Sequence, residues 1–408
     1  MLLDPDIDKV SIRICSRCIY DERVSSIHFD NDGVCNYCHQ TDRLVEQYGT
    51  GANKGIAIFD NILADIRRAG RGKQYDCLVG VSGGTDSSYL VYMAKQWGLR
   101  PLAVHYDNTW NSAIATINIH HVLHGLDVDL YTHVVANKEA DDLFRAFFLA
   151  GVAEIEAATD LGYAYLLRQV AAKYSIRYIL EGHSFVEEGI TPLGRNYFDG
   201  RYIQAIHQRF GRRPLQTYPL MTFARFLRSA IWTRVKFIRP LWYLKYSKQE
   251  AQQFLSRQFG WKYYGGHHLE NRMTAFYHSV YLPQKFHTDM RNNTLSAQVR
   301  NGVISRSEAW SRYNTPPLIE DELVNYFQKR LGFSAAQYTE IMQSPPKNWT
   351  QYPTYKQRFE RCRPLFYLLA KANLVPMSFY LKYCFPSQAP TTPSSIPTRT
   401  GPNDSTQP

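Results

Sequence analysis

The sequence predicts an α/β fold with a doubly wound parallel sheet, preceded by a cysteine module and followed by a helical region. Short apolar runs alternate with segments of helical periodicity between residues 75 and 200, a pattern typical of parallel strands joined by helical crossovers. Two glycines follow the first apolar run, and two pairs of cysteines precede it. We therefore expect a zinc-ribbon-like module at 1–50, an α/β domain at 51–200, a basic and mostly helical domain at 201–385, and a disordered tail at 386–408.

The composition is that of a globular protein. Of the 408 residues, 44% are hydrophobic and 20% are charged, which excludes wholesale disorder. No segment approaches the run of about 18 apolar residues that a membrane-spanning helix needs. The first residues, MLLDPDIDKVSIR, lack the basic start and apolar run of a secretion signal. We therefore expect a cytoplasmic protein without a transmembrane segment.

The charge is uneven along the chain. The formal net charge is +11, and the stretch 200–249 accounts for all of it, because it holds eleven Lys and Arg and no Asp or Glu. Such a stretch can bind a polyanion or the phosphates of a substrate. A solvated basic face or a contact with an anionic membrane is the alternative for any single arginine.

The first element along the chain is the cysteine module. Cys15, Cys18, Cys35 and Cys38 have the spacing C-x2-C-x16-C-x2-C, which can bring four thiolates around one metal ion. In a cytoplasmic chain this spacing favours a metal over disulfides. Four protein ligands leave no open position, so we predict a structural Zn²⁺ site. An iron–sulfur centre uses the same ligands and is the alternative.

The strands and helices follow in order. Residues 51–73 are polar and basic with a short helical stretch, and we interpret them as a connection. Four strands are predicted at 75–81, 101–106, 130–135 and 177–182, with helices between them. Later helices with polar starts are predicted at 247–259 and 305–313.

The loop after the first strand carries the clearest chemical signal. It reads SGGTDS from Ser82 to Ser87 and leads into a helix. Glycines let the backbone approach an anion closely, and the N–H groups and dipole of a helix start favour phosphate. Asp86 can hold Mg²⁺ or cap the helix, and a plain tight turn is the alternative. The Lys-Ser/Thr pair of a Walker A loop is missing, so γ-phosphate transfer is not expected.

This loop resembles the PP-loop of ATP pyrophosphatases, which cleave ATP between the α and β phosphates and transfer AMP to a substrate oxygen. A longer resemblance runs from about Cys15 to Pro317. The shared segments are, in order, the cysteine segment, GVSGGTDSSY, YDNTWNS, YFDGRYIQAIHQRFG and FGWKYYGGHHLENRMTAFYHSVYLPQKF. Together they are similar to the WbpG-like N-acetyl sugar amidotransferases of lipopolysaccharide and flagellin sugar pathways.

The resemblance implies a reaction and a set of site residues. An acetamido group on a nucleotide-linked sugar, such as a UDP-2,3-diacetamido uronic acid, would be adenylated by ATP with Mg²⁺ and converted by ammonia to an acetamidino group, in O-antigen or surface polysaccharide biosynthesis. The implied nucleotide site is Ser82, Gly83, Gly84, Thr85, Asp86, Ser87, Ser88, Asp107 and Asn108. The implied catalytic residues are Asp86, Glu188, His268, Glu270 and Arg272, of which the last three lie in a segment that a surface turn or partner contact explains equally well.

The ammonia requires a source. A glutaminase needs a cysteine nucleophile at the mature N-terminus or on a strand–turn elbow, and here residue 2 is leucine while Cys77 lies inside a predicted strand. The resemblance therefore implies a separate glutaminase subunit, paired in some systems with a cyclase-like partner, and makes nucleic acid an unlikely partner.

Two other functions compete with this one. A PP-loop enzyme that adenylates or thiolates tRNA bases would also carry cysteine pairs and a basic surface, although thiolation needs a cysteine near the loop. A zinc-ribbon protein that only binds nucleic acid is the non-enzymatic alternative, and the intact SGGTDS argues against it.

Overall fold

The computed structural model describes residues 12–192, 196–265, 269–317, 319–372, 374–375 and 377–385. Their centre is a five-stranded parallel sheet of order β3-β2-β1-β4-β5. The strands are β1 Cys77–Gly80, β2 Pro101–Asp107, β3 Leu130–Val134, β4 Tyr178–Leu180 and β5 Lys236–Ile238. The predicted fold class and the four predicted strands are confirmed, and the fifth strand was not predicted.

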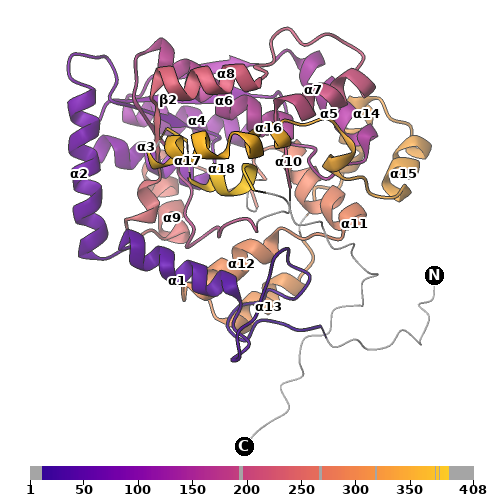
Figure 1. The fold of residues 1–408 in the computed structure, drawn as a ribbon, viewed down its shortest axis with the longest axis horizontal. Helices are drawn as coiled ribbons and strands as arrows, with labels where there is room; N and C mark the ends of the chain where they lie inside the picture. The colour runs from indigo at the N-terminus through magenta and orange to yellow at the C-terminus, as the bar shows by residue number, and fades with distance from the viewer. Residues whose placement is uncertain are drawn as a thin grey trace, which may run out of the picture.

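Helices surround this sheet and continue to the end of the described chain (Figure 1). The N-terminal half contains α1 Asn36–Tyr48, α2 Asn53–Ala69, α3 Thr85–Gln96, α4 Ala113–Leu126, α5 Asn137–Ala150, α6 Ala157–Lys173 and α7 Gly200–Phe210. The C-terminal half contains α8 Phe223–Arg228, α9 Lys248–Phe259, α10 Arg272–Phe276, α11 Leu282–Phe286, α12 Arg291–Arg300, α13 Arg306–Asn314, α14 Leu323–Leu331, α15 Ala335–Gln343, α16 Lys356–Arg361, α17 Arg363–Lys371 and α18 Met377–Tyr383. Single turns of other types are η1 Ser229–Thr233, η2 Pro240–Trp242, η3 Tyr277–Tyr281 and η4 Trp349–Gln351.

Both faces of the three central strands β1, β2 and β4 are buried. Successive residues of a strand point to opposite faces, and Leu78 belongs to one hydrophobic cluster while Val79 belongs to another. The first cluster contains α5 and α6, and the second contains α2, α3 and α4. This burial explains why the strands are nearly continuous apolar runs in the sequence.

The segment 51–73 differs from its prediction as a connection with a short helical stretch. It contains the 17-residue helix α2, in which Phe59, Leu63 and Ile66 are buried against the sheet. These three side chains recur at intervals of four and three residues, which places them on one face of a helix. The charged residues between them occupy the exposed face and dominate the composition of the segment.

The strand β5 lies beyond residue 200, in the region predicted to be basic and mostly helical. Its three residues pair in parallel with β4, with Tyr178 opposite Lys236. All three are only half-buried, and such a short segment has no recognisable periodicity in the sequence. The sheet is therefore completed from residues on both sides of position 200, and the division into domains stays a prediction.

The cysteine module lies beside α12 and α13, at the lower end of the molecule in Figure 1. Arg17 donates a hydrogen bond to the carbonyl of Arg300 at 2.8 Å, and Arg306 donates to the carbonyls of Cys15 and Cys18 at 3.1 and 3.2 Å. The module is thus fastened to residues almost 300 positions later in the chain. Among the described residues, no helix has both the length and the apolar character needed to cross a bilayer.

The helices α10 and α14 extend the main core. The Phe327 ring stacks on Phe276 with centroids 3.7 Å apart, and both side chains are fully buried. Phe148 of α5 contacts Phe327 at 5.0 Å, so this aromatic group connects the later helices to the α/β layers. The α10–α14 region is therefore part of the same core as the sheet.

We predict that Phe327→Ala lowers the free energy of unfolding by about 3–5 kcal/mol, because it removes a large buried ring and leaves a cavity. Urea unfolding followed by circular dichroism measures the change. Leu368→Ala is the control, since that side chain is 65% exposed and its loss should cost less than about 0.5 kcal/mol. Equal unfolding midpoints for Phe327→Ala and the native protein would contradict the shared core.

Candidate functional site

A cavity of about 630 Å³ lies at the carboxyl ends of β1, β2 and β4. In the strand order β3-β2-β1-β4-β5, the chain runs outward from β1 to β3 on one side and from β4 to β5 on the other. Ligands of open α/β sheets bind at such a switch point, beyond the carboxyl ends of the strands. The position of the cavity therefore follows from the topology of the sheet.

The SGGTDS loop forms one wall of this cavity. Gly83 has φ +84°, and a Cβ atom there would lie 2.4 Å from the carbonyl oxygen of Ala115. A Cβ on Gly84 would lie 2.9 Å from Glu270 Oε1. Gly84 is also the N-cap of α3 and provides no side-chain hydrogen bond to the first turn. Gly83 is thus required by its positive φ and by the Ala115 backbone, whereas the end of the Glu270 side chain could shift for a residue larger than Gly84.

Asp86 and Glu188 face the same ammonium group in the cavity. Lys248 Nζ lies 2.6 Å from Asp86 Oδ2 and 3.3 Å from Glu188 Oε1, and the three side chains are 11–18% exposed. Tyr246 donates a hydrogen bond to Asp86 Oδ1. Burial raises the pKa of Asp86, but Lys248 outweighs it and the net shift is downward. Burial lowers the pKa of Lys248, and the two carboxylates reverse this to a net increase.

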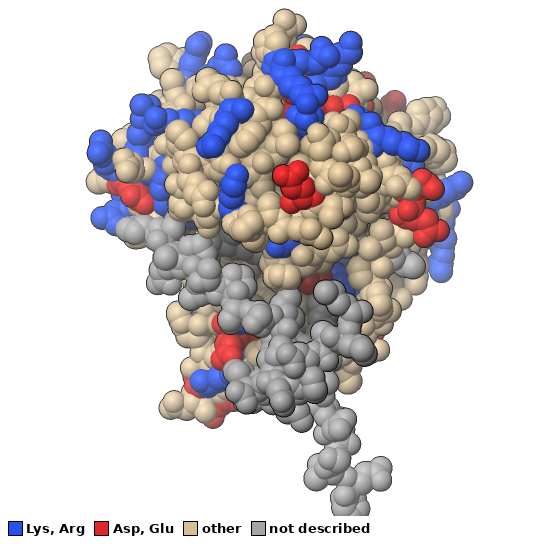
Figure 2. All heavy atoms as spheres, turned by 90° about the vertical axis from the view of Figure 1, so that its right-hand side faces the viewer, with Lys and Arg blue, Asp and Glu red and all other residues tan. Residues whose placement is uncertain are grey.

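Lys248 is a site residue that the sequence did not single out. It was one of eleven basic residues in an acid-free stretch, and only its position at the start of a helix distinguishes it. Of that stretch, only Arg239 and Lys248 line the cavity, and Arg239 is paired with Glu181 at 2.8 Å. Most of the others are exposed. Figure 2 shows Lys and Arg side chains scattered over one face with Asp and Glu between them, rather than a continuous basic surface.

The segment around Glu270 closes over the loop. Glu270 is 4% exposed and accepts a hydrogen bond from Ser82 Oγ at 3.0 Å. Asn271 caps α10 and donates hydrogen bonds to Asn108 and Asn111 at 2.9 and 3.0 Å. The start of the C-terminal region is thus bound to the ends of β1 and β2, although it lies more than 160 residues later in the chain.

The structure brings together most of the predicted site residues. The cavity is lined by Ser82, Gly84, Asp86, Ser87, Asn108, Glu188 and Glu270 among them. The predicted residues that do not line it are Gly83, Thr85, Ser88, Asp107 and Arg272. His268 lies outside the described residues. The functional roles of all these residues stay predictions.

Arg272 and Asp107 have local partners instead. The Arg272 guanidinium is 38% exposed, pairs with Glu320 at 3.3 Å and lies over the Tyr326 ring at 4.8 Å. Asp107 Oδ1 accepts the Thr109 N–H at 2.7 Å. Both side chains therefore act in this structure to hold neighbouring segments together.

Another part of the cavity lining is acidic. Glu154, Glu156 and Asp160 line the cavity, and no sequence motif marked them. Glu154 is 4% exposed and accepts a hydrogen bond from the Tyr202 hydroxyl at 3.0 Å. Burial raises its pKa from 4.5 to about 7, and the hydrogen bonds from Tyr202 and Tyr197 oppose the rise. A carboxyl group in this range can exchange a proton near neutral pH.

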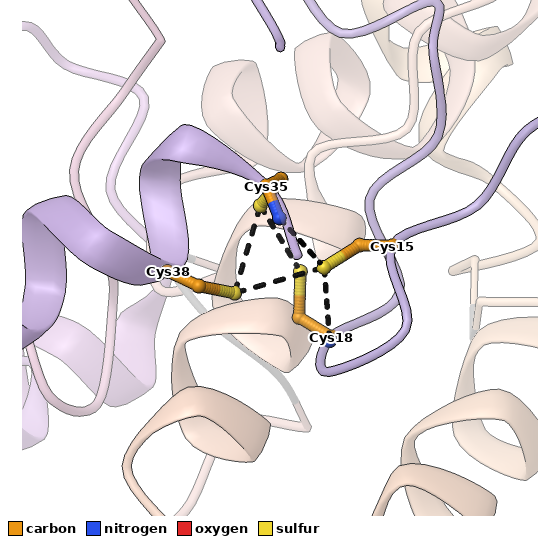
Figure 3. A group of neighbouring side chains, drawn as sticks. All are labelled: Cys15, Cys18, Cys35 and Cys38. Atoms are coloured by element: carbon orange, nitrogen blue, oxygen red, sulfur yellow. Dashed lines mark hydrogen bonds between the residues drawn. The ribbon is translucent and has the colours of Figure 1, made fainter. Parts of the chain in front are cut away.

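The four cysteines form the second candidate site. Their Sγ atoms all lie within 4.8 Å of one another, and all four side chains are buried. Figure 3 shows the sulfur atoms facing one another, with Cys38 on α1 and Cys15 and Cys18 on the preceding loop. The cluster has the residues and the arrangement of a metal site.

The spacing of the sulfur atoms fits one tetrahedral ion. The Cys15–Cys38, Cys18–Cys35 and Cys35–Cys38 sulfur distances are 3.8, 3.8 and 3.5 Å. A tetrahedron with metal–sulfur bonds of about 2.3 Å has edges of about 3.8 Å. Disulfides require sulfurs about 2 Å apart, and a cluster of several irons needs more room between the thiolates.

The surroundings of the cysteines suit thiolate ligands. The backbone N–H of Cys35 points to Cys15 Sγ at 3.2 Å, and Arg300 donates to Cys18 Sγ at 3.4 Å. Arg300 is 6% exposed and lies over the Tyr20 ring at 4.2 Å. A buried guanidinium beside four thiolates offsets part of their negative charge and orients the ligand it contacts.

The cysteine module also reaches the cavity. The Tyr20 hydroxyl donates to Asn293 Oδ1 at 2.5 Å, and Asn293 Nδ2 donates to the backbone carbonyl of Glu188 at 2.9 Å. Asn293 itself lines the cavity. The module thus supports the backbone that positions Glu188.

We predict that Cys35→Ser lowers the metal content of the purified protein from about one equivalent to well below half, because it removes one of four thiolate ligands. Elemental analysis by mass spectrometry measures the content. Cys77→Ser is the control, because Cys77 is equally buried but lies in β1 outside the cluster. A full equivalent retained by Cys35→Ser would show that the cluster is not the metal site.

We predict that Glu154→Gln stabilises the protein at pH 8 and has little effect at pH 5. The folded protein favours the neutral form of Glu154. The stability that the native glutamate contributes is therefore complete below pH 4.5 and is lost as the pH rises through the folded-state pKa of about 7. At pH 8 the native protein has lost at most about 3 kcal/mol of its free energy of unfolding through the ionisation of Glu154, and the glutamine variant avoids this loss. Thermal unfolding across this pH range is the measurement, with the exposed Glu340→Gln as control. Parallel pH profiles for native protein and Glu154→Gln would disprove the shift.

Comparisons with known proteins bear on the C-terminal half. Residues 270–365 match the family model described as LPS biosynthesis protein WbpG-like, C-terminal domain. A search of curated proteins finds no match. The match begins at Glu270, in the wall of the cavity, and extends to α17.

Solved structures of three other proteins show low similarity. The NMN synthetase from Francisella tularensis is 12% identical with a TM-score of 0.30, covering 74% of this chain and 96% of that one. The NH3-dependent NAD synthetase from Campylobacter jejuni is 11% identical with a TM-score of 0.30, and the match covers 71% of this chain and 96% of that one. The U34-tRNA thiolase NcsA from Methanococcus maripaludis, with its [4Fe-4S] cluster, is 10% identical with a TM-score of 0.31. This match covers 67% of this chain and 78% of that one. At these scores the likenesses add nothing to the sheet topology described above. The family match confirms the sequence resemblance over residues 270–365, which are similar to the C-terminal domain of WbpG-like LPS biosynthesis proteins.

Proposed function

We propose that the protein is an ATP-dependent amidotransferase that converts an acetamido group of a nucleotide-linked sugar to an acetamidino group. The observation that carries the proposal is the meeting of two segments in one cavity. The SGGTDS loop, suited to phosphate, forms one wall, and the WbpG-like segment begins in that wall at Glu270. The substrate we favour is a UDP-2,3-diacetamido uronic acid, in surface polysaccharide biosynthesis.

The loop and the start of α3 would hold the pyrophosphate part of ATP. Backbone N–H groups at the N-terminus of α3 carry the positive end of the helix dipole, and the serine hydroxyls of the loop can donate further hydrogen bonds. Asn108 at the end of β2 lies in the same cavity and would contact the rest of the nucleotide.

Mg²⁺ fits the donor set of Asp86 and Glu188. These two carboxylates carry two negative charges against the one positive charge of Lys248, and carboxylate oxygens are the ligands that Mg²⁺ prefers. When bound there, the ion would offset the negative charge of the phosphates. Lys248 would contribute its own charge to the leaving pyrophosphate once ATP competes for its partners.

The chemistry balances in two steps. The amide oxygen attacks the α-phosphorus of ATP, the bond to the bridging oxygen breaks, and pyrophosphate leaves with the electron pair. Ammonia then adds to the activated carbon and loses a proton, and AMP departs with the former amide oxygen, which leaves the amidine. Glu270, 3.0 Å from Ser82 Oγ, would accept this proton beside the loop.

We propose that ammonia comes from a separate glutaminase subunit, with a cyclase-like partner in some systems. Outside the cluster, the described cysteines are Cys77, Cys362 and Cys384. Cys77 is buried in β1, and burial raises its pKa, so it is not an activated nucleophile. The same burial argues against tRNA thiolation by a cysteine beside the loop.

For the cysteine cluster we propose Zn²⁺, in a structural role.

We predict that the purified protein releases AMP and pyrophosphate from ATP in ammonium salt when a UDP-diacetamido uronic acid is present. Asp86→Asn should lower this rate at least about 100-fold, because it removes a charge that positions the phosphates and their counter-ion. Chromatographic detection of AMP gives the rate, and mass spectrometry of the sugar should show the exchange of one oxygen for NH.

Asp60→Asn is the matched control, since Asp60 is exposed on α2 and the rate should not change. Bulk tRNA is run beside the sugars. AMP release that tRNA stimulates and sugars do not would overturn the sugar substrate, and an Asp86→Asn variant of full activity would overturn the assignment of the loop.

A further inference from the structure

A second, smaller cavity adjoins the first. It has a volume of about 260 Å³ and shares Asp160, Glu181 and Phe198 with the wall of the larger cavity. We call it the aromatic annex, because its lining includes Phe223, Phe226, Phe237, Phe359 and Phe379. Ligand pockets are commonly apolar with a few polar groups that fix orientation, and the annex has this character.

Arg168 is the cation of the annex. It lies on α6, is 5% exposed and lines the annex. Among the described residues the Arg168 side chain has no hydrogen-bond or ion-pair partner, and its Nη1 atom is buried. The guanidinium lies 4.7 Å from the Phe237 ring centroid and 5.8 Å from that of Phe226. These ring faces stabilise a cation in part, but they leave its N–H donors unused.

A buried guanidinium with unused donors is costly in an isolated protein. Burial lowers the pKa of Arg168 to about 10, with Glu181 acting in the opposite direction, so the group stays charged at neutral pH. Glu181 does not neutralise it, because Glu181 is paired with Arg239 at 2.8 Å. A ligand with an anionic group would accept hydrogen bonds from these unused donors and compensate the charge of Arg168.

We propose that the aromatic annex binds the carboxylate of a sugar acid through Arg168, and that Arg168 thereby determines the preference of the enzyme for a uronic acid over a neutral sugar. This inference rests on the proposed function. A carboxylate matches the two parallel donors of a guanidinium and carries one negative charge, as the single unpaired cation requires. A diphosphate carries more negative charge than one guanidinium offsets, and the annex lining also includes Asp160, Glu181 and Asp199.

The geometry of a pyranose ring fits the connection of the two cavities. The carboxylate of a uronic acid is attached to C5, directly across the ring from C2. With the carboxylate in the annex, an acetamido group on C2 would point away from it, toward the larger cavity that the SGGTDS loop lines. The phenylalanine rings then pack against the apolar faces of the sugar ring.

The test compares two probes that differ at C5 alone. UDP-N-acetylglucosaminuronic acid carries a carboxylate there, and UDP-N-acetylglucosamine carries a hydroxymethyl group. Calorimetric titration of the full-length chain with each gives the dissociation constants. Arg168→Met keeps the side-chain volume and should weaken binding of the uronic acid about 10- to 100-fold, and binding of the neutral sugar less than about twofold.

Arg168→Lys is the second variant, and it should lose less affinity because it keeps the charge but not the two parallel donors. Arg145→Met is the matched control. Arg145 is 8% exposed, has a buried Nε atom without a partner and lies over Phe333 at 5.0 Å, but it lines neither cavity. Its loss should leave both dissociation constants unchanged. Thermal unfolding of Arg168→Met should show no loss of stability, because an unpaired buried charge is removed.

Three results would overturn the proposal. Equal weakening of both probes by Arg168→Met would assign Arg168 to the diphosphate, and unchanged binding of both would remove it from the site. If the native protein binds neither probe, the assignment of a nucleotide sugar as substrate fails, and the assignment of Arg168 to its carboxylate fails with it. The last result identifies a failure of the proposed function, whereas the first two occur only when the native protein binds nucleotide sugars.

Discussion

The ion group of Asp86, Lys248 and Glu188 is the interaction on which the site depends. Its members come from three distant parts of the chain: the start of α3, the loop after β4 and the start of α9. Each is largely buried, so the loss of one member leaves an uncompensated charge in a medium that solvates it poorly. The group therefore fixes the relative positions of the three segments that surround the phosphate-binding loop. A ligand that competes for Lys248 would change all three contacts together.

The later part of the chain completes the site instead of forming a separate body beside it. Glu270 contacts Ser82 and Asn271 contacts Asn108, so the WbpG-like segment is bound to the ends of β1 and β2. On the other side, Tyr20 and Asn293 connect the cysteine module to the backbone of Glu188. A metal that orders the module would thus also order one wall of the cavity, which gives a structural ion a route to affect the chemistry.

The larger cavity and the annex share Asp160 and Glu181 but differ in the rest of their lining. Lys248 of the larger cavity is paired with carboxylates, and its acidic wall includes Glu154, whose raised pKa reflects burial. The annex is mostly aromatic and contains one cation without a hydrogen-bond partner among the described residues. A substrate with a reactive amide at one end of its ring and an anion at the other would use both environments at once.

The sequence by itself determined the features that depend on local patterns. Apolar runs predicted four strands, three of which are buried on both faces. The spacing of the cysteines from Cys15 to Cys38 predicted the cluster, and SGGTDS predicted the tight loop after β1. Tertiary structure decided the rest. β5 is too short to have a period, α2 was hidden by its charged face, and Lys248 and Arg168 resemble any other basic residue until folding removes them from water. Whether a charged side chain is paired, unpaired or exposed depends on segments far away in the chain, and no local pattern carries that information.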